Sequence, residues 1–136
     1  METPQHGIVW ATLTPESEAL LLQYIPRVFP KQFHSHVTLA FKITAQEFEA
    51  KYPGILNTYH FIRVSSWATD GTRIQAVPVD LSESGLVSSN EHPHITLSAI
   101  EGAKPVESNA MLLHPAQLHT LDVILELPVL VEFSPF

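Results

Sequence analysis

Two segments of the chain alternate regularly between polar and apolar residues. In Phe33–Phe41 (FHSHVTLAF) every second residue is polar or small, and the residues between them are mostly apolar. Side chains of a β-strand point alternately to its two faces, so this period of two predicts a strand. One face would carry His34, His36, Thr38 and Ala40, and the other Phe33, Ser35, Val37, Leu39 and Phe41. His92–Ile100 alternates in the same way and predicts a second such strand.

Shorter runs rich in β-branched and aromatic residues predict the remaining strands. They cover Ile8–Leu13, Tyr59–Trp67, Arg73–Val79, Leu121–Glu126 and Leu130–Phe133, with Pro128 separating the last two. Asp70-Gly71 stands between two of these runs, and this dipeptide is a strong signal for a hairpin turn. We therefore expect the two runs around it to pair as antiparallel strands.

Three segments favour helices. Glu16–Tyr24 has an amphipathic pattern and is followed by a proline that ends it. Thr44 with Glu47 three residues later is a capping-box pattern, which predicts a short helix through about Lys51. A third, short helical turn is expected over Asn109–His114.

The order of these elements indicates the fold class. Strands outnumber helices and show no regular strand–helix–strand spacing, which predicts an α+β fold with a mainly antiparallel sheet and flanking helices. The two alternating strands fall in different halves of the chain, on either side of the polar loop Asp80–Asn90. We therefore expect two pseudo-symmetric lobes. A length of 136 residues without low-complexity segments fits a single domain, 1–136.

Composition narrows the range of functions. The chain has 7 Lys and Arg against 14 Asp and Glu, a formal net charge of −7, and 45% hydrophobic residues. This balance predicts a folded core and argues against a long nucleic-acid duplex as partner, because gripping a duplex needs clustered positive charge. The absence of cysteine excludes disulfides, a thiol nucleophile and metal sites with thiolate ligands. A small anionic ligand held by a few donors fits this composition.

The sequence also bears on localisation. Met1–His6 has neither the basic nor the apolar region of a signal peptide, and no apolar run approaches the roughly 18 residues of a membrane span. We therefore expect a cytoplasmic protein without a membrane partner, in a cell or in the cytoplasm of an infected host.

A duplicated motif is the sharpest signal in the chain. His34–Leu39 (HSHVTL) and His92–Leu97 (HPHITL) share the pattern His-x-His-aliphatic-Thr-Leu and start 58 residues apart. Residues two apart share one face of a strand, so each copy presents an imidazole and a hydroxyl together, with aliphatic residues behind them in the core. We expect the two His-Thr pairs, His36 with Thr38 and His94 with Thr96, to face one another across one cleft.

Such a cleft suits phosphodiester chemistry. One neutral imidazole takes a proton from the attacking water or hydroxyl, and the other, protonated, gives a proton to the leaving oxygen. An unperturbed histidine pKa near 6.5 lets both forms coexist near neutrality. The two threonine hydroxyls can donate to the non-bridging oxygens, where charge builds in the transition state.

The two tetrads His36–Leu39 and His94–Leu97 resemble those of the 2H phosphoesterase superfamily. The second copy and its sequel, HPHITLSAIEGAKPVESNAML, look most like the branch found in Swiss-army-knife RNA-repair proteins and related phage enzymes. This resemblance implies metal-independent cleavage of phosphodiesters, typically 2′,3′-cyclic phosphates on nucleotides or RNA ends. In phage relatives it implies cleavage of cyclic oligonucleotides that serve as antiviral signals. It assigns catalysis to His36 and His94 and phosphate binding to Thr38 and Thr96, with no cofactor.

Two other classes of function remain open. Four histidines in two His-x-His pairs could bind zinc or iron as in a cupin-like site, although no carboxylate lies between Thr38 and Ala45 and metal ligation does not explain the threonines. A non-catalytic nucleotide-binding module would keep the cleft without turnover. His34 and His92 are either residues that orient the catalytic pair or strand-entry residues without a catalytic duty.

Further residues are candidates for substrate binding. Trp67 and Trp10 could stack on a nucleobase, although Trp10 lies in an apolar strand where core packing is the simpler role. Lys104, Ser108 and Asn109 follow the second tetrad and could reach phosphate or ribose. His60, His114 and His119 lack a threonine partner and are assigned no function. The expected partner is a small cyclic nucleotide or an RNA 3′ end, and the oligomeric state is left open.

Overall fold

A computed structural model describes residues 5–136, so most of the segment used to exclude a signal peptide lies outside the described residues. The strands are β1 (His6–Leu13), β2 (Lys31–Gln32), β3 (His36–Thr44), β4 (Tyr59–Thr69), β5 (Ile74–Pro78), β6 (His94–Ala99) and β7 (Gln117–Pro135). The helices are α1 (Pro15–Tyr24), α2 (Ala45–Lys51) and α3 (Glu107–Leu113). This confirms an α+β fold. No helix within residues 5–136 combines the length and hydropathy needed to cross a membrane.

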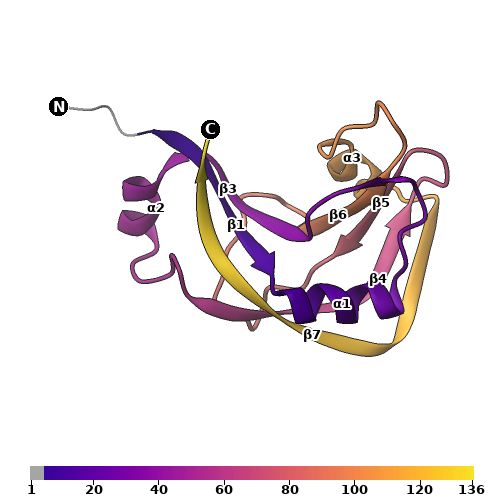
Figure 1. The fold of residues 1–136 in the computed structure, drawn as a ribbon, viewed down its shortest axis with the longest axis horizontal. Coiled ribbons are helices and arrows are strands. Elements are labelled where there is room, and N and C mark those ends of the chain that lie inside the picture. Colours follow the sequence, from indigo (N-terminus) through magenta and orange to yellow (C-terminus); the bar gives the residue numbers. More distant parts are fainter. Residues whose placement is uncertain (1–4) are drawn as a thin grey trace.

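All strand pairings are antiparallel, and they join the seven strands of the described chain into one sheet. Its order is β2-β6-β3-β1-β7-β4-β5, and β5 also pairs with β6, so the sheet closes on itself. The long strand β7 pairs with β4 along one part and with β1 along another, and it follows a curved path across the molecule (Figure 1). It connects the part of the sheet around β1 and β3 with the part around β4.

The interior of this closed sheet is the main hydrophobic core. Val9, Val37, Ile62, Ile95 and Leu127 are fully buried there and come from five different strands. Helix α1 contributes its buried Leu21 to the same core. Helices α2 and α3 lie toward opposite ends of the long axis (Figure 1). A smaller cluster under α3, which includes Ala76 and Met111, packs that helix onto the sheet.

The predicted local signals operate as expected. Thr44 accepts a hydrogen bond from the N–H of Glu47 and donates its own N–H to the Glu47 carboxylate, at 3.1 Å each, which confirms the capping box of α2. Asp70 accepts from the backbone N–H of Thr72 and Arg73, and Gly71 has a positive φ of 83°, which only glycine adopts readily. The hairpin between β4 and β5 is therefore confirmed.

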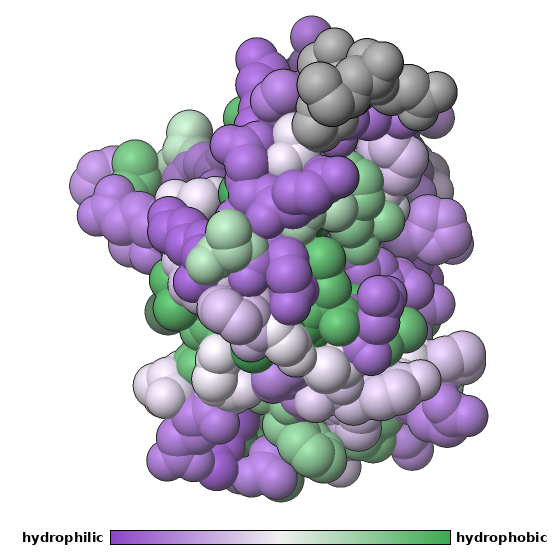
Figure 2. All heavy atoms as spheres, turned by 90° about the vertical axis from the view of Figure 1, so that its left-hand side faces the viewer, coloured by the Kyte–Doolittle hydropathy of each residue, from purple (hydrophilic) through white to green (hydrophobic). Residues whose placement is uncertain are grey.

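The end of the molecule that carries α2 presents mainly polar side chains to solvent, with apolar atoms visible between them (Figure 2). This agrees with the burial of α2, in which Phe48 is the buried residue and the glutamates and Lys51 are exposed. The helix therefore caps one end of the fold through a single large apolar side chain.

The prediction of two strands around Pro128 was wrong, because both belong to the continuous β7. The Pro128 carbonyl accepts hydrogen bonds from the Thr14 N–H and the Ser17 hydroxyl, so its carbonyl side faces the β1–α1 junction. The N–H and C=O of a strand residue point to the same side of the strand. The side on which Pro128 lacks an N–H therefore faces the point where β1 has already ended, so no ladder hydrogen bond to β1 is lost. Pairing with β4 continues undisturbed through Phe61.

The alternation predicted for Phe33–Phe41 also needs correction. The strand begins only at His36; before it, the Phe33 carbonyl accepts a hydrogen bond from the Arg27 guanidinium at 3.2 Å, and the Ser35 carbonyl accepts one from the Leu13 N–H of β1 at 3.0 Å. A bulge at Leu39 places two successive residues, Leu39 and Ala40, on the core side. The bulge reverses the alternation, so that Phe41 points to the face of His36 instead of the core.

Candidate active site

The two copies of the duplicated motif lie on neighbouring strands. Val37 of β3 pairs with Ile95 of β6 in antiparallel register, and both side chains are 0% exposed. The residues on either side of this pair point to the opposite face. Extending the register by one residue in each direction sets His36 opposite Thr96 and Thr38 opposite His94. Each histidine therefore lies opposite the threonine of the other copy, on either side of the central apolar pair.

A cleft of about 440 Å³ opens over these residues. Its lining consists of Ile8, Trp10, Phe33, His34, His36, Thr38, Phe41, Asn90, His94, Thr96, Pro105, Val106 and Asn109. The four residues singled out by the motif, His36, Thr38, His94 and Thr96, all contribute to it. The volume falls within the range of small-molecule sites.

His94 is fixed in one tautomer. Its Nδ1 lies 2.8 Å from the backbone carbonyl oxygen of His92, and a carbonyl can only accept, so Nδ1 carries the hydrogen. The neutral ring therefore keeps its lone pair on Nε2. Burial lowers the pKa of His94 below its usual value; the bond to the His92 carbonyl partly opposes this effect, and the charge of the His92 ring adds to it. His94 is 8% exposed.

His36 is held by an aromatic contact. The Trp10 ring centroid lies 3.9 Å from that of His36 at an interplanar angle of 46°, and the indole N–H donates to the Ser134 hydroxyl at 3.1 Å. Burial, followed by the nearby charges of His34 and His94, lowers the pKa of His36 to about 4. At neutral pH and without a ligand, His36 is therefore neutral.

Trp10 thus belongs to the cleft, against the expectation of simple core packing. Phe41, Phe33 and Asn90 line the cleft as well, and sequence reasoning missed them. Phe41 was assigned to the core because the bulge at Leu39 was not foreseen. Asn90 closes the polar loop after β5, where the loop composition alone gave no sign of contact with the motif strands.

Thr96 has a buried hydroxyl partner in Ser108. The two side-chain oxygens are 2.9 Å apart, and Ser108 is 0% exposed. Buried hydroxyls almost always satisfy their hydrogen, and within the described chain Thr96 is the side-chain partner of Ser108. Either hydroxyl can donate in this pair; when Ser108 donates, the Thr96 hydroxyl is left to donate to the Pro105 carbonyl, 3.5 Å away, or to a ligand. Ser108 was predicted to touch substrate, but the geometry places it behind Thr96.

Replacing Ser108 by alanine is expected to lower kcat/KM for a cleaved substrate by about 5- to 10-fold, since one hydrogen bond of about 1 kcal/mol orients Thr96. The melting temperature should change little because alanine fills nearly the same volume. The exposed Ser89, whose side chain makes no hydrogen bond within residues 5–136, provides the matched control Ser89→Ala. Equal effects of both substitutions on kcat/KM would refute the positioning role.

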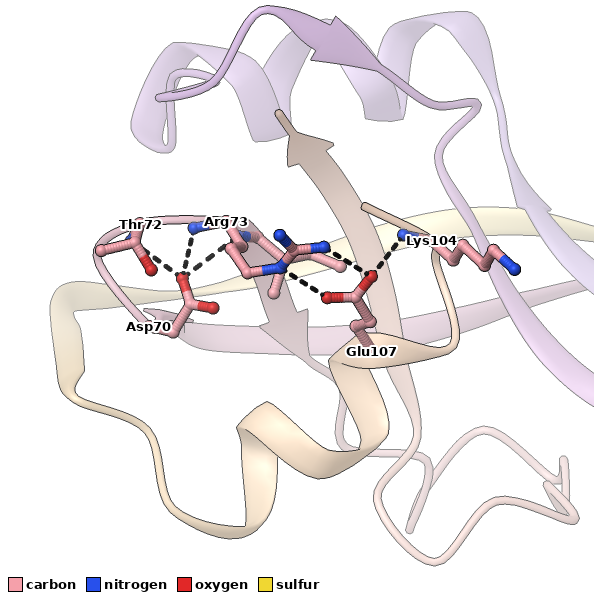
Figure 3. A network of polar contacts seen from close by, with 6 residues as sticks. Asp70, Thr72, Arg73, Lys104 and Glu107 are labelled. Carbon is pink, nitrogen blue, oxygen red and sulfur yellow. Dashed lines mark hydrogen bonds and ion pairs between the residues drawn. The ribbon is translucent and has the colours of Figure 1, made fainter. Parts of the chain in front are cut away.

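Helix α3, which supplies Ser108 and Asn109, is anchored by a polar network at its start (Figure 3). Arg73 donates to both carboxylate oxygens of Glu107, at 2.9 and 3.2 Å, and the Lys104 backbone N–H donates to the same carboxylate at 2.8 Å. This bidentate pair ties the β4–β5 hairpin to the first turn of α3. The hairpin therefore helps to position one wall of the cleft.

Three other sequence candidates lie outside the cleft lining. Trp67 stacks on His119 of the neighbouring strand, with centroids 4.1 Å apart and an interplanar angle of 11°. Lys104 contributes its backbone to the α3 network, and its side chain extends away from Glu107 (Figure 3). His92 uses its carbonyl to orient His94, while His34 lines the cleft.

The structure gives no support to the rival metal site. Across residues 5–136, no group of three or more His, Asp or Glu side chains is arranged to hold a metal ion. Of the four histidines in the two His-x-His pairs, His34, His36 and His94 line the cleft, whereas His92 does not.

Comparisons with known proteins give a likeness in fold. No protein-family model and no curated protein matches the sequence. The crystal structure of a fungal RNA kinase matches in three dimensions, with a TM-score of 0.57 and 16% identity, over 95% of this chain and 46% of that one. The chain therefore spans about half of the length of that structure. At this identity the likeness shows a shared fold, and the resemblance to the 2H superfamily rests on the motif residues.

Proposed function

We propose that the protein is a metal-independent phosphodiesterase of the 2H type, acting on a cyclic phosphodiester. The substrate is a 2′,3′-cyclic phosphate on a nucleotide or RNA end, or a cyclic oligonucleotide signal. The observation that carries this proposal is the convergence of two His-x-Thr motifs, from paired strands, on one cleft. The shared fold with a fungal RNA kinase accords with an RNA end as substrate. Such substrates would place the enzyme in the cytoplasm.

The environments of the two histidines support distinct roles. His36, with its pKa lowered to about 4, is neutral in the free protein and serves as the base that takes a proton from the attacking water. His94 has a carbonyl acceptor on Nδ1 that stabilises its protonated ring, and it serves as the acid that gives its Nε2 proton to the leaving oxygen. The water oxygen bonds to phosphorus as the bond to the leaving oxygen breaks.

The threonines complete the phosphate site in this proposal. Thr96, whose long hydrogen bond of 3.5 Å to the Pro105 carbonyl a ligand oxygen would replace, and Thr38 on the paired strand each donate to a non-bridging oxygen. Around the Val37–Ile95 pair, each histidine lies opposite the threonine of the other copy, and this arrangement supports an origin from two pseudo-symmetric halves. In such a site each half supplies one proton-transfer group and one phosphate donor.

The pH dependence of kcat/KM follows from the two lowered pKa values. Catalysis needs one proton on the pair, and kcat/KM reports the free enzyme, so it peaks between the two apparent pKa values of the pair. Because burial lowers both below 6.5, we expect a bell-shaped profile with its maximum below pH 6.5 and a steady decline from there to pH 8.5. A maximum at pH 7.5 or above would contradict these proton assignments.

The proposal is tested by incubating the protein with a panel of nucleoside 2′,3′-cyclic phosphates, an RNA with a 2′,3′-cyclic end and cyclic dinucleotides. Chromatography then resolves the products. We expect at least one cyclic phosphate to be opened in the presence of excess EDTA. Tight binding without product would identify a non-catalytic nucleotide-binding module, and activity that returns only with an added metal would favour a metal site.

A further inference from the structure

The cleft is free of fixed charge. In the described part of the chain, its lining contains no Lys, Arg, Asp or Glu, and its ionisable side chains are the three histidines His34, His36 and His94. The remaining walls are apolar or neutral, with Trp10 and Phe41 on one side and Asn109 on α3. Any charge of a bound phosphate must therefore be balanced inside the cleft by protons on histidine.

The three arginines have partners other than the cleft. Arg27 donates to the Leu97 and Phe33 carbonyls. The other two arginines are paired with carboxylates: Arg63 with Glu83 and Glu126, and Arg73 with Glu107 (Figure 3).

Three lysines lie over aromatic rings, and two of these rings belong to the cleft lining. Lys31 is 5.4 Å from the Phe33 centroid and Lys42 is 5.8 Å from that of Phe41. Neither lysine lines the cleft itself. These cations therefore neighbour the outer aromatic walls, and the phosphate position between the His-Thr pairs has no permanent positive charge among its lining residues.

The working protonation state of the site sets the charge that it can balance. One histidine must be neutral and one protonated, so the pair carries a single positive charge. A phosphodiester carries one negative charge and makes the occupied cleft neutral. A phosphomonoester carries two above its second ionisation near pH 6, and it leaves one negative charge uncompensated in a largely apolar cleft.

We propose that the cleft selects singly charged phosphodiesters over doubly charged phosphomonoesters, because among the described residues its lining offers no counter-charge except protons on histidine, and the reacting pair His36 and His94 carries one. The inference rests on the proposed function, and it also applies to the product of the proposed reaction. Adding water across a cyclic phosphodiester gives a phosphomonoester, which releases a proton above pH 6 and becomes doubly charged. The second charge then favours departure of the product from the cleft.

A matched pair of unreactive probes tests this selection. 2′-Deoxyadenosine 3′-phosphate and its methyl ester differ by one methyl group that removes the second ionisation, and neither has a 2′-hydroxyl for internal attack. We expect calorimetry to show that the ester binds at least 10-fold more tightly than the monoester at pH 8, and about equally tightly at pH 5. The ratio of the two dissociation constants cancels the titration of the histidines, which affects both probes.

A variant with an added cation provides the second arm. Asn90→Lys places a permanent positive charge in the cleft wall and should reduce the preference at pH 8 to about 3-fold or less. Ser65→Lys adds the same charge at an exposed position of β4, outside the cleft, and should leave the preference unchanged. Equal binding of both probes at pH 8, preference for the monoester, or no binding of either would overturn the inference.

Binding and turnover are separable in this design. Preference for the ester in a protein that opens no cyclic phosphate would retain the selection and reject the proposed catalysis. Turnover of a cyclic phosphate without the preference would retain the catalysis and reject the selection.

Discussion

Replacing either His36 or His94 by alanine is expected to lower kcat on a cleaved cyclic phosphate by about 10²- to 10⁴-fold. Each substitution removes one proton-transfer step, and general acid or base catalysis is worth about that factor. The two losses should be far from additive, because either histidine alone leaves the proton relay incomplete. Steady-state rates of the two single variants and the double variant measure both effects.

The fold should survive these substitutions. Both imidazoles line a cleft open to solvent and lie outside the main hydrophobic core. His114→Ala provides the matched control, because His114 is exposed and lies outside the cleft lining. Near wild-type turnover by His36→Ala on every cleaved substrate, with an intact melting transition, would show that the base is a different group.

The second large effect concerns the apolar pair that joins the two motif strands. Ile95→Ala is expected to lower the free energy of unfolding by about 3 kcal/mol, because it removes a fully buried side chain and leaves a cavity behind the active site. For a chain of this length the melting temperature should fall by roughly 10 °C. Activity measured below the transition should fall as well, since Ile95 packs beneath both His94 and Thr96.

Chemical denaturation of the matched variant Ile124→Ala gives the comparison. Ile124 is on β7 and 67% exposed, so the same truncation there should change the free energy of unfolding by less than about 0.5 kcal/mol. Similar losses in both variants would mean that the β3–β6 contact contributes no special packing.

Much of the fold could be predicted because the decisive signals were local. The capping box of α2 and the Asp70-Gly71 turn depend on residues within a few positions of each other, and both form as expected. The closure of the sheet through β5 and β6, and the continuity of β7 across Pro128, could not be predicted in this way. Both features depend on which strands become neighbours in the sheet, and the local sequence pattern carries no information about strand order.

The candidate site shows the same division. The duplicated motif predicted a common cleft for His36 and His94, since period-two alternation fixes their faces and repetition suggested pairing. The walls of the cleft escaped prediction because a bulge turned Phe41 outward and a helix brought Ser108 behind Thr96. Trp67 was the more favoured of the two tryptophans, yet Trp10 lines the cleft, because strand order decides which side chains neighbour the motif.

The proposed function requires that two histidines open a cyclic phosphodiester without a metal. Its most direct test follows a nucleoside 2′,3′-cyclic phosphate by ³¹P NMR in excess EDTA at pH 6. We expect the cyclic phosphate signal to be replaced by that of a phosphomonoester with the wild-type protein, and to persist with His36→Ala or His94→Ala. A cyclic phosphate signal unchanged by the wild-type protein, or converted equally by the variants, would contradict it.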